Sequence, residues 1–177
     1  MNISLPLTSE QLYDMLDQAG IDYRVLHHAP LMTVDDARAI RGEDETQEGQ
    51  IKNLFLKNKK GKMWLLTLHE DREINLKQAA IDIGAKRFSF CSADRLMTYL
   101  GVVPGAVSPF GLLNDHNREV TFYIDETLLE HQEVHAHPMD NRITVSIGTR
   151  DLLRFLEEHG YGHEVLPRSA GILADEE

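Results

Sequence analysis

Hydrophobic and polar positions alternate with two different periods along this chain, and capping residues or glycines bound most of the periodic segments. In a first group of segments, hydrophobic residues recur with the period of a helix after a Thr, Asn or Ser that can cap it. A capping box at 8–11 strengthens the first helix. The predicted helices cover residues 9–19, 33–41, 76–83, 93–100 and 150–159, with caps at Thr8, Thr33, Asn75, Ser92 and Thr149.

Runs with the composition of β-strands lie between these helices. Residues 51–57 and 62–68 are rich in leucine and aromatic residues and flank a turn at 58–61, which predicts a hairpin of central strands. Because some connections are hairpin-short and others pass through helices, we expect an α/β fold of the α+β type. Its core would be a mixed, mostly antiparallel and barrel-like sheet flanked by helices. Further strands are predicted at 23–27, 120–124, 134–137 and 142–147.

The length of 177 residues and the absence of a flexible linker predict one domain over 1–170, followed by an acidic tail at 171–177. No apolar run approaches the roughly 20 residues that span a bilayer, and the first residues do not resemble a signal peptide. We therefore expect a soluble, cytoplasmic protein with no membrane partner. Cys91 is the only cysteine, which excludes an internal disulfide and fits a reducing compartment.

The charge of the chain is unevenly distributed. A formal net charge of −11 argues against indiscriminate binding to nucleic acid, so DNA is not an expected partner. Residues 52–62 nevertheless hold five lysines and no acidic residue. A basic strip on an acidic body suits one chosen part of a polyanion, although a lysine cluster at a hairpin tip can also be a solvated turn.

Residues 101–110 form a loop of small residues and two prolines between a predicted helix and a strand. Glycine lets a ligand approach the main chain, and proline restricts the loop without supplying a donor. Such a loop can present backbone N–H groups to a phosphate or to the oxyanion of an acyl-transfer reaction. The alternative interpretation is a plain turn.

Lys52 and Asn53 lie side by side at the start of the predicted hairpin, with side chains on opposite faces of the strand. A lysine in this run either reaches water at the strand edge or points into a polar pocket. His135 and His137 share one face of a predicted strand and could bind zinc together. The chain lacks Cys-x-x-Cys and His-Glu-x-x-His, so we expect no metal and no other cofactor.

Several common catalytic motifs are missing. Ser108 is not part of a Gly-x-Ser-x-Gly elbow and is followed by proline, which makes it a poor nucleophile. The chain contains neither the phosphate-binding loop of nucleoside triphosphatases nor a dinucleotide fingerprint. With these motifs absent, the chemistry that remains for this chain is hydrolysis in which no side chain acts as the nucleophile.

Collinear segments of this chain together resemble the YbaK/ProX family of aminoacyl-tRNA editing domains, and the resemblance spans roughly residues 5–165. It is greatest to the free-standing members that deacylate alanyl-tRNA(Pro). Because alanine is smaller than proline, a synthetase pocket cannot exclude it, and a second site must remove it. The segments that carry the resemblance are 28–37, 51–68, 101–115, 120–125 and 137–147.

The resemblance also implies roles for individual residues. The family's lysine and asparagine correspond to Lys52 and Asn53, its Gly-x-x-x-Pro loop begins at Gly105, and its histidine before proline corresponds to His137. With Ala106, whose N–H would bind an oxyanion together with that of Gly105, these form the expected catalytic set. The expected substrate-binding residues are Leu31, Met32, Val107, Ser108 and Pro109. The expected tRNA-binding residues are Lys57, Lys59, Lys60 and Lys62.

The implied partners are the aminoacylated acceptor end of tRNA(Pro) and, functionally, prolyl-tRNA synthetase. Three alternatives remain open at this point. The substrate could be cysteinyl-tRNA(Pro) or another tRNA that carries a small residue. The chain could be a binding module that has lost hydrolysis, or it could be a metal-dependent hydrolase.

Overall fold

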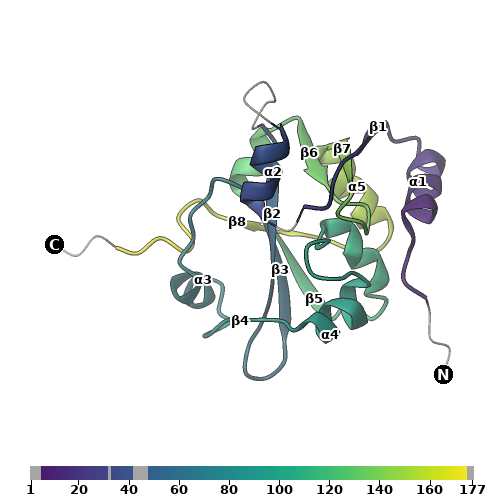
Figure 1. The fold of residues 1–177 in the computed structure, drawn as a ribbon. Helices are drawn as coiled ribbons and strands as arrows, with labels where there is room; N and C mark the ends of the chain where they lie inside the picture. Colours follow the sequence, from purple (N-terminus) through teal and green to yellow (C-terminus); the bar gives the residue numbers. More distant parts are fainter. Residues whose placement is uncertain (1–4, 32, 42–47, 175–177) are drawn as a thin grey trace.

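Two β-sheets of this protein meet near the start of one long hairpin, as Figure 1 shows for the computed structural model. The structure describes residues 5–31, 33–41 and 48–174. The larger sheet has five strands in the order β4, β2, β3, β5 and β8. Their bounds are Ser89–Phe90, Ile51–Lys57, Met63–His69, Val120–Asp125 and Glu164–Leu166.

The larger sheet is mixed, as the sequence predicts. β2 pairs antiparallel with both β3 and β4, whereas β3 pairs parallel with β5 and β5 with β8. All but the last residue of β3 are buried, because packed elements cover both faces of the sheet there. The central position of the hairpin predicted from its leucine content is therefore confirmed.

The smaller sheet is antiparallel and contains β1 (Tyr23–His27), β7 (Ile143–Gly148) and β6 (Glu133–Ala136), in that order. A parallel bridge between Gln50 and His135 joins it to the chain that enters β2. The two sheets remain separate, so the expectation of a barrel-like core is wrong in this respect. Closure would need continuous pairing between the sheets, and the described residues provide only this bridge.

Helices and single turns flank the sheets. The capping box of the first helix is confirmed, because Thr8 accepts from the N–H of Gln11 and the Gln11 side chain accepts from the N–H of Thr8. The predicted helix at 93–100 starts as α4 and continues as a π-helical turn. The bounds are α1 Ser9–Gln18, α2 Val34–Arg41, α3 Leu76–Asp82, α4 Ala93–Arg95, η1 Leu96–Leu100, η2 Pro109–Asn114, η3 Glu126–Glu130 and α5 Thr149–Glu158.

The cap predicted for α5 is wrong. Gly148 occupies the N-cap position and makes no side-chain cap bond, and Thr149 is already the first helical residue. The Thr149 hydroxyl instead donates to the carbonyl of His131 at 2.7 Å. A tertiary contact with the segment before β6 therefore takes the hydroxyl that a local cap would have used.

Two hydrophobic clusters hold the elements together. The larger packs α1, α5 and the smaller sheet against β3 and β5, with Phe110, Phe122 and Phe155 fully buried. The smaller includes Trp64 and Leu66 of β3 and Ala80 of α3. Among the described residues, no helix has the length and apolar character that crossing a bilayer requires.

Candidate functional site

A pocket of about 960 Å³ lies where the smaller sheet faces the start of β2. Residues of β1, β2, β6 and β7 line it, together with the loop that precedes η2. The fold thus brings together segments that are far apart in the sequence. The predicted site residues that line the pocket are Leu31, Lys52, Asn53, Gly105, Val107 and His137.

Other predicted residues lie elsewhere. Ala106, Ser108 and Pro109 are buried, and none of the three is among the residues that line the pocket. The Ser108 hydroxyl accepts from the N–H of Phe110 and caps η2, so its role in this structure is local. Met32 lies outside the described residues.

Lys52 is half-buried near the first residue of β2. Its Nζ donates a hydrogen bond to the carbonyl oxygen of Arg72, in the turn after β3. Desolvation lowers the pKa of Lys52, while the carboxylates of Asp71 and Glu73 act in the opposite direction. The lysine therefore points into a polar environment, one of the two arrangements that the sequence left open.

Asn53 connects the hairpin to the Gly/Pro loop. Its Nδ2 donates to the carbonyl of Val107 at 3.1 Å, and its Oδ1 accepts from the hydroxyl of Thr67 at 2.7 Å. Thr67 is buried on β3, and both bonds are partly buried. This side chain is placed to hold the loop against β2 in addition to any contact with a substrate.

Gly105 and Val107 of the loop line the pocket. Gly105 has a φ of 91°, a conformation that L-residues with a side chain rarely adopt. The N–H of Ala106 turns back and donates to the carbonyl of Val103 at 3.1 Å. Within the described part of the chain, no acceptor is found for the N–H groups of Gly105 and Val107, which makes this pair the better candidate for binding an oxyanion.

His137 follows β6 and is mostly buried. Its Nδ1 lies 2.8 Å from the carbonyl oxygen of Ile143, which can only accept, so Nδ1 carries the proton. Desolvation lowers the pKa of His137 and keeps the ring neutral. The other nitrogen, Nε2, is then an acceptor at the pocket wall.

Two histidine–hydroxyl pairs that the sequence analysis missed form the wall on the smaller sheet. His28 Nε2 lies 2.7 Å from the Thr144 hydroxyl, and His135 Nδ1 lies 2.7 Å from the Ser146 hydroxyl. Thr144 and Ser146 are two apart on β7 and therefore share a face. The sequence signal that could have revealed these pairs was the two-residue spacing of the hydroxyl residues, on a strand opposite the predicted strand that carries the histidines.

The metal hypothesis receives no support from the arrangement of His135 and His137. The first bonds to Ser146 and to the carbonyl of Glu48, and the second to the carbonyl of Ile143. Among the residues that the structure describes, no group of three or more His, Cys, Asp or Glu side chains could hold a metal ion.

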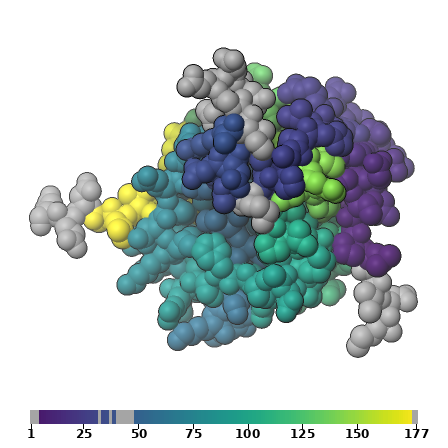
Figure 2. All heavy atoms as spheres, viewed as in Figure 1, coloured from purple at the N-terminus to yellow at the C-terminus, as the bar shows by residue number. Residues whose placement is uncertain are grey.

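α2 lies beside the pocket and is joined to the end of the hairpin by charge pairs. Arg38 pairs with Asp71 and, at 3.4 Å, with Glu70, which is buried and lines the pocket. Figure 2 shows α2, in dark blue, on the molecular surface. Glu70 was missed in the sequence because an acidic residue just after a strand is normally solvated.

The lysines expected to bind tRNA lie at the other end of the hairpin. Figure 1 places the β2–β3 turn far from α2, and Lys57 closes β2 opposite Met63. Lys57 lies five positions along the strand from Lys52, or roughly 17 Å. Lys59 and Lys60 are exposed, and Lys62 Nζ lies 5.2 Å from the centre of the Trp64 ring.

Known proteins resemble this chain over most of its length. A sequence profile of the aminoacyl-tRNA editing domain matches residues 28–155. The prolyl-tRNA editing protein ProX of Acetoanaerobium sticklandii is 38% identical over 82% of this chain and 88% of its own length. The prolyl-tRNA synthetase associated domain-containing protein 1 of Danio rerio is 33% identical over 84% of this chain and 81% of its own.

Solved structures share the fold. The crystal structure of a candidate trans-editing enzyme for prolyl tRNA synthetase covers 93% of this chain and 98% of that chain, with a TM-score of 0.68 at 21% identity. This likeness concerns the fold alone. On the strength of the profile match and the 38% identical relative, the chain belongs to the aminoacyl-tRNA editing domain family, a family of hydrolases that deacylate aminoacyl-tRNA.

Proposed function

We propose that this protein removes alanine from alanyl-tRNA(Pro), acting in trans on tRNA that prolyl-tRNA synthetase has misacylated. The observation that carries the proposal is the meeting of Lys52, the Gly105 loop and His137 around one pocket in a chain of the editing family. The names of two relatives also point to prolyl-tRNA editing and to the prolyl-tRNA synthetase system. A volume of about 960 Å³ leaves room for a terminal adenosine with its aminoacyl group.

The reaction is ester hydrolysis by water. Water attacks the carbonyl carbon of the alanyl ester, the bond from that carbon to the ribose oxygen breaks, and this oxygen takes a proton. The N–H groups of Gly105 and Val107 would stabilise the oxyanion of the tetrahedral intermediate. We assign this role to Val107 instead of Ala106, whose N–H is bonded within the loop.

Lys52 and His137 position the reactants in this scheme. The Lys52 ammonium would bind the terminal phosphate or ribose and hold the ester in place. The Nε2 atom of neutral His137 would accept a hydrogen bond from the attacking water and orient it. Asn53 would keep the oxyanion-binding loop at its distance from β2.

The lysines at the hairpin tip would contact a different part of the tRNA. Because they lie roughly 17 Å along the strand from Lys52, they cannot bind the same phosphate. We propose that Lys57, Lys59, Lys60 and Lys62 contact the backbone of the acceptor region while the pocket holds the 3′ end. Affinity from so few phosphate contacts would be modest and would decrease with salt.

The test is hydrolysis of alanyl-, prolyl- and cysteinyl-tRNA(Pro) by the purified protein, with Lys52→Ala alongside. We expect loss of alanine alone, and a decrease of about 100-fold or more in kcat/KM for the variant. Faster hydrolysis of cysteinyl-tRNA(Pro) would identify that tRNA as the substrate instead. Binding without hydrolysis would favour a non-catalytic module.

A second measurement tests whether water is the nucleophile. The Ser146 and Thr144 hydroxyls both face imidazole nitrogens, an arrangement that can also activate a nucleophile. A reaction with radiolabelled alanyl-tRNA(Pro), quenched in acid during turnover, is expected to leave the protein unlabelled. Labelled protein would show an acyl-enzyme and contradict direct attack by water.

A further inference from the structure

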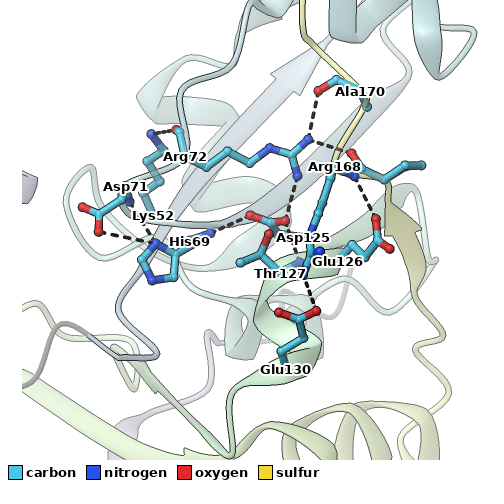
Figure 3. Close-up of polar contacts among 11 residues, drawn as sticks. Lys52, His69, Asp71, Arg72, Asp125, Glu126, Thr127, Glu130, Arg168 and Ala170 are labelled. Atoms are coloured by element: carbon cyan, nitrogen blue, oxygen red, sulfur yellow. Dashed lines mark hydrogen bonds and ion pairs between the residues drawn. The ribbon is translucent and has the colours of Figure 1, made fainter.

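A buried ion pair lies directly behind the turn that Lys52 contacts. Arg72 Nη1 donates to Asp125 Oδ1 at 2.7 Å, and the side chains are 10% and 0% exposed. Figure 3 shows that the two residues approach from different elements, the turn after β3 and the end of β5. Neither side chain lines the pocket, so substrate binding does not account for this charge pair.

Asp125 bonds the main chain at two points. Its Oδ2 accepts from the N–H of His69 at 3.0 Å, and its Oδ1 also accepts from the N–H of Thr127 at 2.9 Å. The Arg72 N–H donates to the carbonyl of His69 at 3.0 Å. The carboxylate therefore fixes both ends of the turn at 69–72, and buried, fully bonded networks of this kind are rigid.

The guanidinium of Arg72 extends this network to the C-terminal segment. Its Nη2 donates to the carbonyl of Pro167 at 2.7 Å. The same atom donates to the carbonyl of Ala170 at 2.9 Å (Figure 3). Three acceptors reached through two nitrogens of one side chain match the fork of an arginine and not the single ammonium of a lysine. The position of the Arg72 main chain is thus set from two sides.

This network reaches the site through the carbonyl oxygen of Arg72. The Arg72 carbonyl accepts the hydrogen bond from Lys52 Nζ, as Figure 3 shows. Asp71 and Glu73, on either side of Arg72, are the two carboxylates whose charges act on the Lys52 ammonium. Three successive residues of this turn therefore act on the end of a side chain that is otherwise flexible.

We propose that Arg72 and Asp125 are positioning residues, which hold the Arg72 carbonyl where it fixes the Lys52 ammonium for ester hydrolysis. This inference rests on the proposed function and adds to it two residues outside the pocket. A misplacement of about 1 Å in a catalytic group can decrease a rate by roughly 100-fold. Loosening the turn is therefore expected to affect catalysis well before it unfolds the protein.

The test uses Arg72→Lys and Asp125→Asn, two variants that preserve side-chain size better than alanine. Arg168→Gln is the matched control, because Arg168 lies on the same C-terminal segment but its ion pair with Glu130 is exposed. Melting curves verify that each protein is folded. We expect kcat/KM for alanyl-tRNA(Pro) to decrease by about 10- to 100-fold in the first two variants and to stay unchanged in the control.

A double-mutant cycle separates positioning from general damage to the fold. In a Lys52→Met background, Arg72→Lys is expected to cause no further decrease in kcat/KM, because the ammonium that it positions is gone. An equal decrease in both backgrounds would overturn the inference.

A spectroscopic measurement does not depend on activity. In protein carrying lysine labelled with ¹³C at Cε, the Lys52 signal is identified by its loss in Lys52→Met. It is expected to shift in Asp125→Asn and not in Arg168→Gln, neither of which adds a lysine signal. If the wild-type protein hydrolyses none of the three tRNAs, the proposed function fails. The Lys52 signal alone then decides whether Arg72 and Asp125 position the Lys52 ammonium. A Lys52 signal that does not shift overturns the inference.

Discussion

His137 gives the site a pH dependence whose sign can be worked out. Burial lowers its pKa from the ordinary 6.5, so below that pH the unfolded chain binds a proton that the folded chain resists. The contribution of His137 to the free energy of unfolding is therefore fully present above pH 6.5 and is lost as the pH falls. Between about pH 7 and pH 5, we expect the wild type to lose more stability than His137→Gln.

Urea denaturation at each pH measures this difference. The comparison with His137→Gln removes the contribution of the other histidines, since both proteins contain them. Equal pH slopes for the two proteins would show that burial does not perturb the titration of His137.

Gly105 offers a second test at the residue scale. Alanine at a φ of 91° costs about 1 to 2 kcal/mol and must move the loop. Gly105→Ala is therefore expected to decrease the stability of the protein, and to decrease kcat/KM about tenfold or more. Gly84→Ala is the matched control, because Gly84 has a φ of 78° and open space around it. We expect a similar loss of stability with normal deacylation. Equal activity of the two variants would argue against a catalytic loop.

Single residues also show what sequence could not reveal. Lys52, Gly105 and His137 were identified from motifs that resemble those of the family, and the fold brings them to one pocket. The contact between Asn53 and the Val107 carbonyl spans 54 positions of sequence, and so only the folded chain shows that this amide holds the loop. The bond from the Ala106 N–H to the Val103 carbonyl could not be read from the sequence, because the direction of an N–H depends on the backbone conformation of the loop.

At the scale of elements, the β2–β3 hairpin has two ends with different chemistry. One end carries Lys52 and Asn53 into the pocket, and the other carries exposed lysines. Because both ends belong to the same strand, the distance between the pocket and the exposed lysines is fixed. The hairpin can therefore act as a spacer between the 3′ end of a tRNA and a more distant part of its backbone.

Charge reversal at the hairpin tip tests this spacer. We expect Lys59→Glu with Lys60→Glu to decrease kcat/KM for full-length alanyl-tRNA(Pro) by about tenfold and to weaken its dependence on salt. Lys77→Glu on α3 is the control at another exposed position. A short aminoacylated fragment that cannot reach the tip should be hydrolysed normally by all variants. An equal loss on the fragment would contradict the spacer.

The regular elements were largely predictable, because caps and periodicity are local properties. Thr8, Thr33, Asn75 and Ser92 each bond the main chain three residues later, as their positions suggest. The two-residue β4 and three-residue β8 were missed, because strands this short carry no measurable period. They exist only because the edges of the larger sheet offer them partners.

For the molecule as a whole, the C-terminal boundary of the packed chain is testable. Gly171 accepts from the N–H of Asn75 and donates to Asp82, so its main chain is bonded to α3 and to the residue that caps it. Ile172 and Leu173 are 60% and 59% exposed. We expect truncation after Gly171 to change the unfolding free energy by less than about 0.5 kcal/mol.

Truncation after Leu166 should behave differently. It removes the carbonyls of Pro167 and Ala170 that accept from Arg72, and buried donors without partners are costly. We expect a loss of about 2 kcal/mol or more in urea denaturation, together with slower deacylation. Equal stability of the two truncated proteins would show that the C-terminal segment is not part of the core.

The sequence by itself determined the kinds of element, most of their limits, and the motif residues that resemble those of an editing enzyme. These depend on local backbone preferences and on residue identity, which are written in short stretches of chain. Only the tertiary structure decided that the sheets stay unclosed, that α2 lies beside the pocket, and that Asp125 and Arg72 stand behind Lys52. Such contacts join distant segments, and their stability comes from burial, which no local pattern specifies.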